Sequence, residues 1–176
     1  MRIGIDVFTI RDLKLDPYQT IDYLNGLGFE GAQFAGIKSM DENLDVGKLK
    51  DIRDYADSKN MYSHVSVSCV NPVIFSGSFD ELTGILQEEI KAAAAGNWHE
   101  LHSYINSATE RYEHPIPWQV HVNQCIKLIN TLRPTLEKYG SRINIETHGE
   151  TTYDVLKVIG ATGEHLTGVC LDTANT

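Results

Sequence analysis

Short apolar runs alternate with longer amphipathic stretches along the 176 residues of the chain. Each run has the length of a β-strand. Successive runs start roughly 25 to 43 residues apart, which is the space that one strand and one helix occupy together. Parallel strands need a crossover of this kind between them, so the pattern predicts a parallel sheet built from βα units. The six runs begin near Ile3, Ala32, Ser63, Glu100, Ile143 and Gly168.

The intervening stretches carry the start and stop signals of helices. Residues 16–19 (DPYQ) and 78–81 (SFDE) both match a capping box, in which two side chains satisfy backbone groups of the first turn. A third helix is expected over about 117–139, where Gly140 ends it and Pro134 kinks it.

Two α/β architectures fit this order of elements, an open doubly wound sheet and a TIM barrel of βα units. A doubly wound nucleotide-binding sheet usually has a glycine-rich turn after its first strand. Here that turn is residues 8–12 (FTIRD), which contain no glycine, so the barrel is favoured. A closed TIM barrel has eight units. We therefore expect residues 1–176 to be one partial barrel domain with strands 1–6, strands 7 and 8 being absent. The alternative is a six-stranded protein with a partner chain or a different sheet order.

Composition and charge narrow the class of protein. The chain has 15 Lys and Arg against 24 Asp and Glu, a net charge of −9, and many of the acids fall in polar helical stretches such as 45–57, expected to face solvent. A general nucleic-acid binder would need a basic face, so no nucleic-acid partner is expected. No apolar run approaches the roughly 18 residues of a membrane helix, and the N-terminus lacks the layout of a signal peptide. A cytoplasmic protein without a membrane partner is the prediction.

Three cysteines are present, at positions 69, 125 and 170, and their spacing matches no zinc motif. An odd number of cysteines in a chain without a signal peptide indicates reduced thiols. We expect them to pack as small apolar side chains.

The most informative polar residues follow the last two apolar runs, because function in parallel α/β folds gathers at the C-terminal ends of the strands. Glu146 and His148 are two residues apart, so an extended strand turns both to the same side. Asp172 follows a run that a barrel would bury, and a desolvated carboxylate needs a partner. A divalent cation between the converging carboxylates would be such a partner. Private hydrogen bonds or ion pairs with Arg or Lys are the alternative, and spacing alone favours neither.

The two segments that hold these residues resemble known motifs. Residues 145–149 (IETHG) and 170–175 (CLDTAN) look like the strand-5 and strand-6 motifs of the xylose isomerase-like TIM-barrel superfamily, the sugar phosphate isomerases and epimerases. Residues 3–8 and 27–33 resemble the first two units of the same group. The resemblance follows the βα order over the whole chain and is specific at the two carboxylate motifs.

The resemblance implies a metal centre and a chemistry. A divalent metal ion (Mn, Mg, Co or Zn) would be held by Glu146 and Asp172, with a strand-7 His and a strand-8 Glu lying beyond Thr176. Glu146, or the strand-8 Glu, would act as the general base that moves a proton through an enediolate-like intermediate. Gln33 stands where many members have Glu, so the resemblance assigns it no role.

Four further residues are candidates for substrate binding. His64 and His102 lie in the third and fourth apolar runs, where they can line the pocket or, as in relatives such as endonuclease IV, bind metal. His148 is expected to contact substrate or to orient the neighbouring glutamate. Arg111 follows the fourth run, where the segment could form a lid, and it either binds a phosphate or carboxylate there or makes a surface ion pair.

The remaining aromatic and imidazole side chains are expected to have structural roles. Trp98 and Trp118 could form an apolar wall for a sugar ring, but packing is the favoured role for Trp118 at its helix start. The other four histidines fall in helices or loops and are expected at the surface; they are His99, His114, His121 and His165.

Three classes of function follow from these predictions. The first is a metal-dependent isomerase or epimerase of small sugars, sugar phosphates or hydroxyketones. Self-association of such an enzyme into a homo-oligomer is a further expectation. The second keeps the barrel but changes the chemistry to a polyol dehydratase or an endonuclease-IV-like hydrolase, and the acidic charge disfavours the nuclease. The third is a sugar-binding domain or an inactive fragment, which would bind metal weakly through two ligands.

Overall fold

The computed structural model describes residues 2–106 and 109–172. All six predicted strands are present, run parallel, and pair in the order of the chain. The predicted α/β fold class is confirmed, and in the described part of the chain the sheet is open, with β1 and β6 at its edges. The strands are β1 (Ile5–Asp6), β2 (Gly31–Phe34), β3 (Tyr62–Ser66), β4 (Glu100–Ser103), β5 (Arg142–Glu146) and β6 (Thr167–Cys170).

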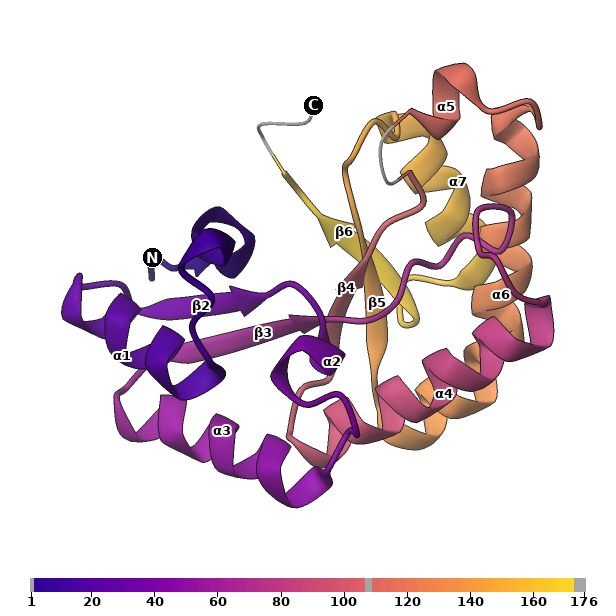
Figure 1. Ribbon diagram of the computed structural model, residues 1–176. Helices are drawn as coiled ribbons and strands as arrows, with labels where there is room; N and C mark the ends of the chain where they lie inside the picture. The colour runs from indigo at the N-terminus through magenta and orange to yellow at the C-terminus, as the bar shows by residue number, and fades with distance from the viewer. Residues whose placement is uncertain (1, 107–108, 173–176) are drawn as a thin grey trace.

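Helices connect the strands and form an arc along one side of the sheet (Figure 1). The long ones are α1 (Pro17–Gly26), α3 (Val46–Ser58), α4 (Phe79–Ala95), α6 (Trp118–Tyr139) and α7 (Thr152–Thr162). The short ones are the 3-10 helix η1 (Val7–Leu13), α2 (Ile37–Met40) and α5 (Glu110–Glu113).

The local start and stop signals work as the sequence predicts. Both predicted capping boxes form, at the N-termini of α1 and α4, and α7 has a third built on Thr151 and Asp154. Helix α6 contains Pro134 and ends where Gly140 adopts a left-handed φ of 59°. Because a side chain is strained in that conformation, glycine favours the end of the helix there.

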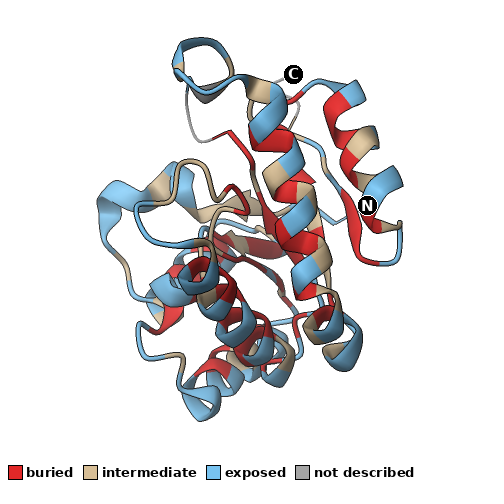
Figure 2. Ribbon diagram, turned by 90° about the vertical axis from the view of Figure 1, so that its right-hand side faces the viewer, coloured by how far each residue is buried: buried red, intermediate tan, exposed pale blue. Residues whose placement is uncertain are grey.

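The hydrophobic core lies between the sheet and the arc of helices. Outward-facing strand residues such as Val65, Leu101 and Ile143 are fully buried against the apolar stripes of α4 and α6. Figure 2 shows this arrangement, with the long helices buried along the side that faces the sheet and exposed along the other. Trp98 also belongs to this core, where its indole N–H donates to Ser63 Oγ (3.0 Å), so it does not form a wall for a sugar ring.

The opposite face of the sheet, which we call the inner face, is polar. Strand residues alternate between the two faces, so the neighbours of the apolar positions point to the inner face. The register places Gln33 beside His64 and Glu146 beside Cys170. The sequence pattern therefore separates packing and chemistry between the two faces.

Other predictions about surface and core are also met. The acids of the 45–57 segment that lie on α3 or its N-cap are exposed, namely Asp45, Asp51, Asp54 and Asp57. Of the three free cysteines, Cys125 is fully buried and Cys69 and Cys170 are half-buried. No helix in the described part of the chain has the length and apolarity to cross a membrane.

A pair of leucine substitutions tests where the core lies. Leu128 of α6 is fully buried, whereas Leu156 of α7 is 60% exposed. We expect Leu128→Ala to lower the free energy of unfolding by about 2–5 kcal/mol, because it removes buried apolar contacts and leaves a cavity. Leu156→Ala should change it by less than about 0.5 kcal/mol. Urea denaturation followed by circular dichroism measures both, and equal losses would contradict this position of the core.

Candidate metal centre

Three ligand-type side chains converge at the C-terminal ends of β5 and β6. Glu146 is the last residue of β5, His148 lies two residues beyond it, and Asp172 lies two residues beyond β6. One carboxylate oxygen from each acid and one imidazole nitrogen all lie within 4.8 Å of one another. Thr173, Ala174 and Asn175, which complete the second motif, lie outside the described residues. The sequence predicted the two acids as ligands, and the structure adds the imidazole to the same cluster.

His148 is held from several directions. Its Nε2 lies 3.2 Å from Glu146 Oε1, and its ring stacks on Tyr104 with a centroid separation of 5.3 Å. Its backbone N–H donates to Glu150 Oε2 (2.7 Å), and its carbonyl accepts from Asn106 Nδ2 (2.6 Å). Few of its torsions are left free, so the imidazole is positioned before any ligand binds.

Glu150 joins the loop after β4 to the loop after β5. Its Oε1 accepts the backbone N–H groups of Ile105 (3.0 Å) and Asn106 (2.8 Å), while its Oε2 accepts that of His148. The carboxylate is buried, and three N–H donors offset its desolvation. Sequence reasoning missed Glu150, because its partners are backbone groups that no side-chain pattern identifies.

Asp172 is positioned by the hydroxyl of Thr147. Thr147 Oγ1 donates to the Asp172 carbonyl (3.1 Å) and accepts the Asp172 N–H (3.0 Å). The Thr147 side chain thus extends the hydrogen-bond ladder between β5 and β6 beyond the end of β6. It does so where the Asp172 side chain approaches Glu146. Thr147 is 5% exposed, so water does not easily replace these bonds.

The charges at the cluster favour an ionised carboxylate. The hydrogen bond from His148 and its charge hold the pKa of Glu146 below its ordinary value, and the same hydrogen bond raises the pKa of His148. His102 lies on the other side of Glu146, with 3.8 Å between its Nε2 and Oε2, and burial lowers the pKa of this imidazole. Glu146 is therefore an anion between two imidazoles, which is a suitable ligand for a cation.

The inner face continues from this cluster to β1. Burial, with the negative charges of Glu146, Asp172 and Asp6, raises the pKa of the Cys170 thiol to about 11. A charge on β1 thus contributes to the electrostatic environment of a thiol on β6, the other edge of the sheet. His64 is exposed on this face between them.

Arg111 is occupied by contacts within the protein. Its Nη1 donates to Asp154 Oδ2 (2.7 Å) and to the Gly149 carbonyl (3.0 Å), and its guanidinium lies 5.6 Å from the ring centroid of Trp118. These contacts attach α5 to the N-terminus of α7. Of the two roles predicted for Arg111, the geometry matches the ion pair. Trp118 packs, as predicted.

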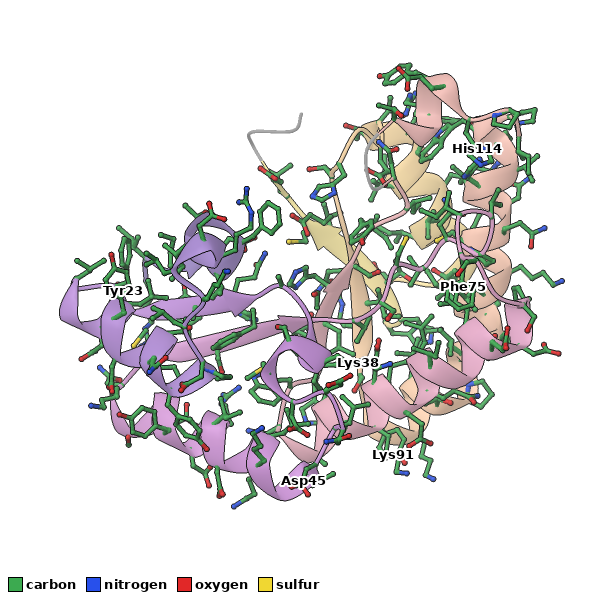
Figure 3. All side chains as sticks on the ribbon, in the orientation of Figure 1. Tyr23, Lys38, Asp45, Phe75, Lys91 and His114 are labelled. Carbon is green, nitrogen blue, oxygen red and sulfur yellow. The ribbon has the colours of Figure 1, made fainter. Side chains whose placement is uncertain are left out.

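The prediction that His121 lies at the surface is wrong. His121 is fully buried at the start of α6, where Nδ1 accepts from Asn71 Nδ2 (2.9 Å) and Nε2 donates to His114 Nδ1 (3.2 Å). Figure 3 labels His114 at the corner between α5 and α6. His99 and His165 are exposed, as expected.

Comparison with known proteins identifies the fold. No protein-family model and no curated protein sequence matches the chain. Among solved structures, a D-psicose 3-epimerase in the presence of D-fructose matches with a TM-score of 0.76 and 14% identity over 98% of this chain and 64% of that one. A D-psicose 3-epimerase with D-tagatose from Clostridium cellulolyticum H10 gives 0.76 and 13% over the same shares. A probable 3-DHS dehydratase from Bacillus anthracis gives 0.70 and 13% over 98% and 63%.

These matches show the fold of an α/β barrel. More narrowly, the fold is that of the xylose isomerase-like TIM barrels, which confirms the resemblance seen in the sequence at the level of fold. The chain spans 64% of the length of the first of these barrels.

The donor set fits a divalent cation. Two carboxylates and one imidazole are hard or borderline ligands of the kind that Mn, Mg, Co and Zn accept. Among the described residues the ion-pair partners of Glu146 are the imidazoles of His102 and His148 and not a Lys or Arg, so a structural salt bridge does not account for the position of this carboxylate.

The hydroxyl of Thr147 gives a first test of this geometry. Thr147→Val keeps the shape of the side chain but loses both bonds to Asp172, so we expect exchange of the Asp172 amide hydrogen to accelerate by roughly tenfold or more. Thr147→Ser retains the hydroxyl and should exchange nearly as the wild type does. Hydrogen exchange measured by NMR distinguishes them, and equal protection in the valine variant would refute the role of Thr147.

The ion pair between α5 and α7 gives a pH-dependent test. Burial opposes ionisation of Asp154, but hydrogen bonds from Thr151 and Arg111 outweigh it and lower the pKa below its ordinary value of 3.8. The stability this supplies is present above pH 3.8 and is lost as the pH falls through the lowered pKa. Asp154→Asn should therefore cost about 1–3 kcal/mol at pH 7 and less near pH 2.5, which lies below the ordinary value. Urea titrations at both pH values measure the difference, with exposed Asp51→Asn as the control that should show little at either.

Proposed function

We propose that the protein is a metal-dependent isomerase or epimerase of small sugars or hydroxyketones. The observation that carries this proposal is the cluster of Glu146, His148 and Asp172 at the C-terminal ends of adjacent strands in a xylose isomerase-like barrel fold. Sugar epimerases among the matched structures support the same class of reaction. For the whole protein we also propose a small sugar or hydroxyketone as the substrate, a cytoplasmic location and self-association into a homo-oligomer.

The chain's own residues would divide the work as follows. Glu146 and Asp172 would hold the cation, with His148 as a third ligand or as the group that orients Glu146. The chemistry that a divalent ion held by these residues would supply is polarisation of adjacent substrate oxygens, which would make the neighbouring C–H of a hydroxyketone more acidic.

Glu146 would also serve as the general base that removes that proton and returns it to carbon. Its lowered pKa keeps it ionised at neutral pH, and His102 on its other side contributes an imidazole to the pocket. The loops joined by Glu150 would keep these groups in place while the substrate binds.

A dehydratase on the same barrel is the second candidate. The match to a probable 3-DHS dehydratase favours it, and elimination of water begins with the same removal of a proton beside a carbonyl. An endonuclease-like hydrolase is less favoured, because the net charge of −9 opposes a nucleic-acid substrate.

We also propose that residues 1–176 are the first six βα units of a longer barrel. Their match to 63–64% of the length of each of three solved barrels supports this.

Replacing the proposed base tests the assignment directly. Glu146→Gln in the full-length protein removes both the anionic ligand and the base. We expect at least a ~100-fold loss of sugar interconversion assayed with Mn²⁺ or Mg²⁺. Calorimetry of the same variant should show weaker binding of Mn²⁺.

Glu88→Gln is the matched control, because Glu88 is exposed on α4 and its ion-pair partner among the described residues is Lys91, also at the protein surface. It should leave turnover and metal affinity unchanged. Undiminished activity in Glu146→Gln would overturn the assignment, and loss of water from the substrate in place of isomerisation would favour the dehydratase.

A further inference from the structure

A hollow of about 420 Å³ lies on the inner face over β1, β2 and β3. Asp6, Gln33 and His64 line it toward the C-terminal ends of these strands, and Arg2 and Tyr62 line it toward the other ends. The function proposed above uses none of these side chains to hold metal or to move a proton.

The hollow presents hydrogen-bonding groups whose capacity is only partly used. Gln33 Nε2 donates to Asp6 Oδ2 (3.2 Å), and Asp6 Oδ1 accepts from the Phe8 N–H (2.8 Å). Within residues 2–106 and 109–172, no protein group hydrogen-bonds to Gln33 Oε1 or to the ring nitrogens of His64. Carboxamide, carboxylate and imidazole groups side by side can both donate to and accept from hydroxyl groups.

The charge of the hollow is unfavourable for an anion. Arg2 donates to the carbonyls of Glu30 (3.2 Å) and Asn60, and its Nε lies 4.0 Å from the Glu30 carboxylate, so its charge is already compensated. Asp6 has no Lys or Arg ion-pair partner in the part of the chain that the structure describes. A phosphate group placed here would meet the Asp6 carboxylate, and the described residues that line the hollow offer no uncompensated cation to offset it.

The hollow and the metal centre share one continuous polar face. His64 lies at the hollow. On the next strand, β4, His102 pairs in register with Ser66, two residues further along β3 than His64, and its Nε2 is 3.8 Å from Glu146 Oε2. A small molecule with one end at Glu146 would therefore direct its other end along this row toward Asp6 and Gln33.

We infer that Asp6, Gln33 and His64 form a subsite for the non-reacting hydroxyl groups of an uncharged polyhydroxy substrate, and that the subsite disfavours the phosphorylated form of the same sugar. The inference rests on the proposed function for the reacting end of the substrate and narrows its substrate class. Hydroxyl groups would accept from His64 and donate to Gln33 Oε1 and Asp6, whereas a phosphate can only accept at neutral pH.

A metal-free titration tests the subsite separately from the metal centre. In ¹H–¹⁵N NMR spectra of the 176-residue chain in EDTA, D-fructose should shift the amide resonances of β1–β3 with millimolar saturation. D-fructose 6-phosphate should bind there at least roughly tenfold more weakly. Glu146→Gln should leave this titration unchanged, so failure of the proposed enzymatic function would not affect the result.

Two variants define which groups are responsible. Gln33→Leu should weaken binding of D-fructose roughly three- to tenfold, because it loses a hydrogen-bonding partner. Asp6→Asn removes the charge and should bring the affinity for D-fructose 6-phosphate close to that for D-fructose. Each variant is compared with Glu88→Gln, and its spectrum first checks that it is folded.

Three results would overturn the inference: equal or tighter binding of the phosphate by the wild type, no shift in β1–β3 at 100 mM D-fructose, or discrimination that survives Asp6→Asn.

Discussion

The buried carboxylate of Glu150 is the interaction on which the candidate site depends. It accepts three backbone N–H groups from two loops that are more than 40 residues apart in the chain, and its burial makes each of these bonds costly to lose. A parallel sheet determines where strands end but not where the following loops go. Glu150 fixes two of those loops, and with them the backbone of His148.

The close approach of these loops also restricts Gly149. Its φ is 121°, and a Cβ at this position would lie 2.6 Å from Asn106 Nδ2, the atom that donates to the His148 carbonyl. A larger residue would be strained and would displace Asn106. The IETHG segment is therefore a unit in which a candidate ligand, a hydroxyl that extends the ladder, an imidazole and a glycine required by the close approach each have a geometric reason for their position.

The sequence predicted the fold more completely than it predicted the contacts around the candidate site. The six strands, the capping boxes and the glycine that ends α6 follow from local periodicity and backbone preferences, and these dominate where helices pack on a parallel sheet. Glu146 and Asp172 were predicted as ligands because carboxylates after apolar runs are costly without partners, and the structure brings their side chains together. Glu150, Thr147 and the burial of His121 were missed, because each depends on contacts between loops or helices far apart in sequence. The predicted role of Arg111 was left open for the same reason, since Asp154 lies 43 residues further along the chain.

The three converging ligand groups all belong to β5, α7 and β6, a single βαβ unit. Their contacts therefore close a short stretch of chain, which costs little loop entropy and can form early in folding. The hollow over β1–β3, in contrast, is made from units at the other edge of the sheet. The proposed ion site and the proposed subsite for the rest of the substrate thus lie in separate segments, and substitutions in the first three units are expected to alter one while leaving the other intact.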